Sequence, residues 1–452
     1  MIGIPGRESG IMKGFRAISI YVVVGLLILG LLVGLAVGYF IGGGGGESKS
    51  ATSTPAFNES SSVNFTAAGG GLQGEIPIGI LLPQTGSLAQ DGRDNIKAAK
   101  LAIEDFNKLL ESIGAPFRFK AIVADSGTDP NKALAALQTL YNQHHVQIVV
   151  GTDSSWVLSG VMSFANEHHI VMISPASTSP ALALKDYIFR IVGNDKGQGK
   201  ALAALVHNNG FNAAVVIFRD EAYGRGIAEA FKENFEALGG TAVLVPYNPQ
   251  KSDYAPEVQK LASEVEKLLN EGKNVAVIIV AFETDGINIL SHAADIPVLS
   301  QVKWFASESI RSPALLKAPD KVRQFLAKVE LEGTFPIPPK SPLGEWFEKH
   351  FEEVYGHPPE SPFSPYAYDA AYLACLAVTI AGKYDGTVIA KVLPEVAKNY
   401  YGVTGWKLLD ENGDLKYQEY SIWKYVCEGG SCEFIDIAIY DPQSGKIQQI
   451  AG

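Results

Sequence analysis

Short runs of Val, Ile and Leu alternate with longer amphipathic segments along most of this sequence, and this alternation constrains the fold more than any other feature. One series includes IPIGILL at residues 76–82, QIVVG at 147–151 and IVMIS at 170–174. A second series begins with AAVVIF at residues 213–218 and includes VAVIIVAF at 275–282. Continuous apolar runs separated by helices are typical of parallel strands buried on both faces. Two such series predict an α/β protein with two doubly wound lobes.

The last third of the sequence has a different pattern. It contains three helical segments and then strand-like runs around Trp406, Ile422 and Ile437. These late strands need a sheet to join. We therefore expect the chain to return to the first lobe and finally to cross once more to the second.

An uncharged apolar stretch near the start, residues 17–41, is long enough to cross a bilayer, which takes about 20 apolar residues. Three basic residues and one acidic residue precede it. The positive-inside rule therefore predicts a cytoplasmic segment at residues 1–16 and a single-pass cell-membrane anchor, with the soluble part on the extracytoplasmic side. The alternative is a cleaved leader, since Lys13-Gly14 precedes the apolar run.

Residues 42–75 are rich in Gly, Ser and Thr and are expected to form a flexible tether. The two N-x-[ST] sequons of the chain, at Asn58 and Asn64, both lie in this tether, and we expect them to be glycosylated. Outside the cell, Cys427 and Cys432 are expected to close a small disulfide loop around EGGS, the alternative being two reduced thiols in a hairpin.

Composition and missing motifs narrow the function. The net charge of −11 and the lack of a basic stripe argue against a nucleic-acid partner. The sequence contains no G-x-x-x-x-G-K-[ST], no G-x-S-x-G and no H-E-x-x-H. We therefore expect neither enzyme activity nor a cofactor or metal ion.

The segment IPIGILLPQTGSLAQDGRDNIKAAKLAIEDFN, which begins at Ile76, resembles the opening of the branched-chain amino-acid (leucine/isoleucine/valine) binding proteins of ABC transporters. Further motifs follow in the family's order: VADSGTDPNKALAALQTL, IVVGTDSS, ISPASTSP, YIFRIVGNDKGQG, DEAYGRG and SPYAYDAAYLA. The similarity extends to about Tyr425. It implies the type I periplasmic-binding-protein fold, in which three crossovers join two α/β lobes around a ligand cleft. The lobes expected on this fold comprise residues 76–195 and 331–418 (lobe 1) and residues 196–330 and 419–452 (lobe 2).

The resemblance also implies roles for particular residues. In this family a G-x-x-x-S loop and the loop after the next strand hold the carboxylate of an amino acid. Here these loops supply Ser155 and Thr178, which would donate hydroxyl groups, and Ala176, whose carbonyl would accept from the ammonium. Glu308, in the segment WFASESI, would supply the carboxylate that pairs with the ammonium.

Two positions depart from the family's pattern. Phe282 stands where the family often has Tyr, which removes one hydroxyl contact. Asp91 stands where leucine-binding members carry an aromatic residue, and a carboxylate beside the ligand's side chain fits poorly with an aliphatic ligand. Either the ligand is polar or Asp91 points away. Trp156 and Tyr223 are candidates for the aromatic walls of the cleft, with packing as the alternative.

The function implied by the resemblance is that of an extracytoplasmic solute-binding protein of an ABC importer. Such a protein captures an amino acid, of the branched-chain type or a related small zwitterion, and delivers it to permease subunits. The alternatives are a ligand-sensing ectodomain of the same fold and a protein that binds an amide, a urea-like molecule or another small organic solute. A secreted enzyme acting on amides is disfavoured, because no nucleophile–base constellation is present.

Overall fold

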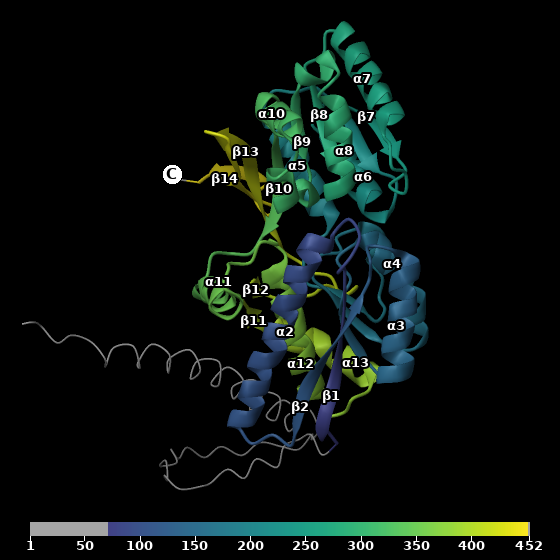
Figure 1. The fold of residues 1–452 in the computed structure, drawn as a ribbon, viewed down its shortest axis with the longest axis vertical. Helices are drawn as coiled ribbons and strands as arrows, with labels where there is room; N and C mark the ends of the chain where they lie inside the picture. The colour runs from purple at the N-terminus through teal and green to yellow at the C-terminus, as the bar shows by residue number, and fades with distance from the viewer. Residues whose placement is uncertain (1–70, 451–452) are drawn as a thin grey trace, which may run out of the picture. The chain divides into compact units, whose positions relative to one another are not determined.

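The computed structural model of the protein describes residues 71–450, which form two α/β lobes (Figure 1). Several predictions fall outside these residues: the cytoplasmic segment 1–16, the span 17–41, the tether 42–75 as far as residue 70, and the sequons at Asn58 and Asn64. Within residues 71–450, no single helix has the length and apolar character of a membrane span. One sharply bent pair of helices meets these criteria by length and composition alone.

Lobe 1 is built on a five-stranded parallel sheet with the strand order β2-β1-β3-β4-β5. Its strands are β1 (Gly74–Leu82), β2 (Phe117–Asp125), β3 (Ile148–Gly151), β4 (Val171–Ser174) and β5 (Ile188–Arg190). Successive side chains of β1 point to opposite faces: Ile80 and Leu82 join the apolar cluster on one face, and Leu81 joins the cluster on the other. The sheet is therefore buried on both faces, as the continuous apolar runs predict.

Helices cover both faces of this sheet. The helices of the lobe are α2 (Ala89–Ser112), α3 (Pro130–His144), α4 (Ser155–Glu167), α11 (Pro342–Tyr355), α12 (Ser364–Ala381) and α13 (Gly386–Lys398), with a short η1 (Pro180–Leu182). α2, α12 and α13 share one apolar cluster, and α3 and α4 share the other. In α2 the buried residues Ile96, Ala99, Ile103 and Phe106 recur every three to four positions, which directs one apolar stripe to the sheet.

Lobe 2 contains an eight-stranded sheet with the order β15-β14-β13-β10-β9-β8-β6-β7. Its strands are β6 (Ala213–Arg219), β7 (Thr241–Tyr247), β8 (Val275–Val280), β9 (Lys303–Ala306), β10 (Glu332–Ile337), β13 (Glu419–Glu428), β14 (Ser431–Asp441) and β15 (Lys446–Gln449). The strands from β7 to β10 are parallel, and β13, β14 and β15 extend the sheet in antiparallel order. A separate pair, β11 (Tyr401–Gly402) and β12 (Gly405–Trp406), lies in the returning segment.

The lobe-2 sheet is also covered on both faces. The helical elements of the lobe are α5 (Asp195–Asn208), α6 (Ala222–Ala237), α7 (Ala255–Asn270), α8 (Glu283–Ala293), η2 (Pro297–Ser300), η3 (Glu308–Ile310), α9 (Pro313–Leu316) and α10 (Asp320–Lys328). α5 and α6 belong to one apolar cluster, and α7, α8 and α10 belong to the other. This arrangement puts strand ends of both sheets, with the loops that follow them, beside the same cavity.

Within residues 71–450 the chain passes between the lobes three times: after β5, after β10 and before β13. The sequence assigned residues 331–418 to lobe 1, whereas β10 pairs with β9 and β13 in the lobe-2 sheet. The passage follows β10, where a proline-rich segment cannot continue the strand ladder. The third passage begins near Asp414, which bridges to Arg190 of β5.

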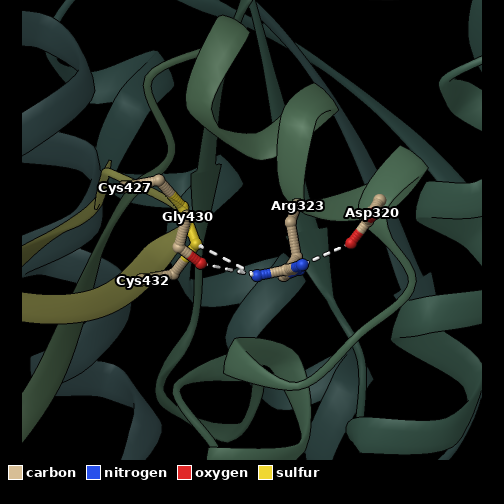
Figure 2. The surroundings of a disulfide bond; sticks show 5 residues. All are labelled: Asp320, Arg323, Cys427, Gly430 and Cys432. Atoms are coloured by element: carbon tan, nitrogen blue, oxygen red, sulfur yellow. Dashed lines mark hydrogen bonds and ion pairs between the residues drawn. A yellow bond between two sulfur atoms is a disulfide. The ribbon is translucent and has the colours of Figure 1, made fainter.

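A disulfide joins Cys427 and Cys432 at the β13–β14 hairpin (Figure 2). The two central residues of the turn are Gly429 and Gly430, with φ of +59° and +88°. A two-residue hairpin turn with positive φ at both positions favours glycine there. Figure 2 also shows Arg323 of α10, whose Nη1 donates to the carbonyl of Gly430 at 3.0 Å. The third cysteine, Cys375, is a buried free thiol in α12.

Candidate ligand-binding site

A cavity lies between loops that follow the strands of both sheets. Lobe 1 contributes the first turn of α2, the loop after β3 and the loop after β4, and lobe 2 contributes segments after β6, β8 and β9. In open α/β sheets ligands bind outside the carboxyl ends of the strands. Six of the predicted site residues line the cavity: Asp91, Ser155, Ala176, Tyr223, Phe282 and Glu308. Its free space of about 30 Å³ holds only a few water molecules, so a larger ligand requires the lobes or side chains to move.

Two predicted residues, Trp156 and Thr178, are not among the residues that line the cavity. Trp156 lies in the first turn of α4 and is partly exposed. Thr178 is 1% exposed, and its backbone N–H donates to Ser155 Oγ at 3.0 Å. The Thr178 hydroxyl has no hydrogen-bond partner among residues 71–450 and lies near the carboxylate of Asp195, which is fully buried. Their roles toward a ligand stay predictions.

The hydroxyl groups of ISPASTSP mainly hold the loop in place. Ser174 Oγ and Ser177 Oγ both donate to the carbonyl of Thr152, at 2.6 and 2.9 Å. Ser179 Oγ donates to the carbonyl of Ala222 in lobe 2 at 2.6 Å. The loop after β4 is thus fastened both to the loop after β3 and to the start of α6.

The N-terminus of α4 faces the cavity through Ser154 and Ser155. Ser154 is the N-cap residue, yet no side chain caps the helix. The first N–H groups of a helix have no partner within the helix, and they carry the positive end of the helix dipole. This end of the cavity is therefore suited to an anion such as a carboxylate.

Glu308 follows β9 and is 2% exposed. Its Oε2 accepts from Gln198 Nε2 at 2.6 Å, and its Oε1 accepts from Ser309 Oγ at 3.3 Å. Burial raises the pKa of Glu308 to about 7. Asp195, fully buried behind it, has a pKa raised by burial and by the charge of Glu308. A cation in the cavity would stabilise the ionised form of Glu308.

Two stacked aromatic rings form a wall of the cavity. The rings of Tyr223 and Phe282 are 5.4 Å apart, and Tyr223 donates its hydroxyl proton to Ser307 Oγ at 2.8 Å. The guanidinium carbon of Arg219 lies 3.8 Å from the centre of the Phe282 ring. Arg219 Nη1 lies 2.7 Å from Asp285 Oδ2, and this ion pair neutralises the charge of the guanidinium.

Three further carboxylates gather near the start of α2: Asp91, Asp153 and Glu283. Burial raises the pKa of Asp91 to about 6, that of Asp153 to about 7 and that of Glu283 to about 8. The neighbouring Asp91 contributes to the last two shifts through its charge. Asp91 and Glu283 belong to different lobes and lie close enough to interact, and their like charges favour a proton on one of the two carboxyl groups.

Sequence reasoning left six lining residues unidentified: Leu88, Asn95, Asp153, Ser154, Ser309 and Phe363. Asp153 and Ser154 belong to the motif GTDSS, in which the resemblance assigned a role only to Ser155. Their position in the loop after β3 could have identified them as lining residues. Asn95 and Phe363 lie on α2 and beside α12, where no strand-end rule points to them.

These raised pKa values predict how stability depends on pH in the ligand-free protein. Each carboxyl group holds its proton to a higher pH when folded than when unfolded, so its contribution is full at about pH 4 and is lost as pH rises through about 6–8. The melting temperature should therefore fall between pH 5 and pH 8.5. Glu283→Gln cannot ionise and should gain about 2 kcal/mol over the wild type at pH 8.5.

Thermal unfolding of the ligand-free protein across this pH range measures the effect. Asp125, whose pKa is lowered by Lys132 and other donors, acts below about pH 4 and does not interfere. The exposed Glu345→Gln serves as the control and should reproduce the wild-type slope. A wild-type melting temperature that rises from pH 5 to pH 8.5 would contradict the burial of these charges.

The two lobes and the cavity between their strand ends define a type I periplasmic-binding-protein fold. The model of the family described as the receptor family ligand binding region matches residues 96–427, and the chain belongs to this family. The chain is 26% identical over 356 residues to the leucine-, isoleucine-, valine-, threonine- and alanine-binding protein of Pseudomonas aeruginosa, covering 77% of this chain and 90% of that protein.

Solved structures share the fold. The leucine binding protein LivK of Thermotoga maritima has a TM-score of 0.68 at 21% identity, covering 82% of this chain and 99% of LivK. A solute binding protein of an ABC transporter from Rhodopseudomonas palustris, in complex with 3,4-dihydroxybenzoic acid, has a TM-score of 0.66 at 19% identity. It covers 81% of this chain and 98% of its own. The resemblance carried by the sequence motifs is confirmed, and the chain is of the solute-binding type found in ABC transporters.

Proposed function

We propose that this protein captures an amino acid or a related small zwitterion in the cavity between its lobes. The proposal is based on one observation: a subsite suited to an anion and a subsite suited to a cation border the same cavity. The uncapped N-terminus of α4, with Ser155, is suited to a carboxylate, and the buried carboxylate of Glu308 is suited to an ammonium. The carbonyl of Ala176 supplies a further acceptor for the ammonium.

Because the two subsites belong to different lobes, the ligand contributes fully only when both lobes contact it. Closure around the ligand excludes water and strengthens the charge pairs. Such a protein binds without turnover, so we propose no enzyme activity and no cofactor. The protein would deliver its solute to the permease subunits of an ABC importer, as its membership of the solute-binding type supports.

We further propose that residues 17–41 anchor the protein in the cell membrane with residues 42–452 on the extracytoplasmic side. The uncharged stretch and the basic residues before it support this topology. The Cys427–Cys432 disulfide agrees with an oxidising compartment. Glycosylation of Asn58 and Asn64 belongs to the same proposal.

A binding screen tests the proposed function. Full-length protein in detergent should show a thermal shift with one class of amino acids, and calorimetry should give one ligand per chain. Amides, urea, 3,4-dihydroxybenzoate and a nucleoside complete the panel. If every amino acid is silent and one of these other solutes binds, the zwitterion assignment is wrong, although a solute-binding protein remains. A ligand-sensing ectodomain, the second candidate, would bind in the same way but would not depend on a permease for its output.

A further inference from the structure

The carboxylates around the cavity fall into two groups, and a simple amino acid uses only one of them. The first group is Glu308 with Asp195 behind it. The second group is Asp91 and Asp153 of lobe 1, which line the cavity, together with Glu283 of lobe 2, which follows the lining residue Phe282 and interacts with Asp91. In the proposed function the ammonium of the amino acid pairs with the first group, which leaves the second group to face the ligand's side chain.

One oxygen on each carboxyl group of the second group has no hydrogen-bond partner among residues 71–450: Asp91 Oδ1, Asp153 Oδ1 and Glu283 Oε1. Asp153 is only 8% exposed and lines the cavity. Its Oδ2 accepts from Asn95 Nδ2 at 3.0 Å, while its Oδ1 has no hydrogen-bond partner among residues 71–450. A buried carboxylate oxygen is costly unless a donor reaches it. A ligand that brings an N–H donor to this point would satisfy it.

No basic side chain of the described residues lines the cavity. The nearest buried arginines are already paired: Arg219 with Asp285 and Glu221, and Arg190 with Asp414. Within residues 71–450, no three His, Cys, Asp or Glu side chains converge in an arrangement that could hold a metal ion. The exposed Arg93 of α2 acts on Glu283 through its charge but does not line the cavity. An organic cation brought by the ligand would balance the ionised carboxylates of Asp91 and Asp153.

We infer that the ligand is an amino acid whose side chain ends in a second cationic group, held among Asp91, Asp153 and Glu283. The inference rests on the proposed function, because it adds a side-chain subsite to the zwitterion site. Asp91 of lobe 1 and Glu283 of lobe 2 repel each other when both are ionised, and a positive group placed between them relieves this repulsion. An ammonium or guanidinium group between these carboxylates supplies that charge and draws the lobes together. An aliphatic side chain leaves them unpaired in a closing cavity.

Calorimetry on the full-length protein in detergent at pH 8 tests this inference. Lysine, ornithine and arginine are compared with norleucine, which has nearly the length of lysine without its charge. A charge-assisted hydrogen bond in a dry site changes affinity by about 10- to 100-fold. At least one basic amino acid should therefore bind about 100-fold tighter than norleucine. Cadaverine, which is lysine without its carboxylate, should bind more weakly than lysine, because it has no carboxylate to interact with the N-terminus of α4.

Matched variants locate the effect. Asp153→Asn and Glu283→Gln should each reduce the preference for the basic amino acid over norleucine by about tenfold without weakening norleucine. Glu266→Gln, on the exposed face of α7, should leave the preference unchanged. If norleucine or leucine binds more tightly than every basic amino acid, the inference is overturned and the proposed function stands. If neither class of amino acid binds, the proposed function fails as well.

Discussion

Replacing Glu308 by Gln is expected to weaken the binding of the tightest amino acid by about 10- to 100-fold. The substitution keeps the shape of the side chain but removes the buried charge that faces the ammonium. The fold should be unaffected, because a neutral amide is easier to bury than a carboxylate that is 2% exposed. Calorimetry at pH 8, above the raised pKa of Glu308 of about 7, measures the difference.

The matched control for Glu308 is Glu345→Gln, an exposed carboxylate in the first turn of α11. It should bind the ligand like the wild type. Small-angle scattering should show the wild type contracting when ligand is added and the Glu308 variant contracting only at higher concentration. Unchanged affinity in Glu308→Gln would mean that the ammonium is held elsewhere or that the ligand has none.

Replacing Arg190 by Met is expected to lower the free energy of unfolding by about 3–5 kcal/mol, the largest stability effect that we predict. Arg190 is 1% exposed, and its Nε donates to Asp414 Oδ1 at 2.6 Å. Its Nη1 donates to the carbonyls of Ser179 at 2.6 Å and Ser177 at 3.3 Å. One guanidinium therefore ties together β5, the loop after β4 and the segment before β13. Its loss leaves a buried carboxylate and these carbonyls without a donor.

Urea denaturation measures this effect. The double variant Arg190→Met/Asp414→Asn should recover part of the loss, because it removes the unpaired charge as well. Arg225→Gln breaks a 2.6 Å pair with Asp220 in which the arginine is 58% exposed, and it should cost no more than about 0.5 kcal/mol. Equal effects of Arg190→Met and Arg225→Gln would contradict the structural role of the buried pair.

Much of the fold follows from local sequence pattern. The Val/Ile runs become strands buried on both faces, and the cysteines that flank EGGS meet because a two-residue glycine turn brings them opposite each other. The end of lobe 2 at β10 was harder to predict. The segment TFPIP at residues 334–338 has few features that distinguish the last strand of lobe 2 from the passage between the lobes. Its pairing with β9 and β13 shows that it belongs to the lobe-2 sheet.

The candidate site was predictable where a strand-end rule or the family motif pointed to single residues. Ser155, Ala176 and Glu308 all follow strands, and the structure brings them to one cavity. The contact of Asp91 with Glu283 depends instead on two lobes meeting, which no local pattern encodes. The serines of ISPASTSP show where the strand-end rule fails. A hydroxyl group at a strand end can hold a loop in place as well as bind a ligand, and here the serines hold the loop.

A crystal structure of the protein with its tightest-binding amino acid tests the central claim most directly. The account predicts one ligand between the lobes, with its carboxylate at the N-terminus of α4 beside Ser155 and its ammonium about 3 Å from the carboxylate of Glu308. For a basic amino acid, the second cationic group lies among Asp91, Asp153 and Glu283. A ligand bound outside this cavity, or bound in it with its carboxylate toward Glu308, would contradict the account.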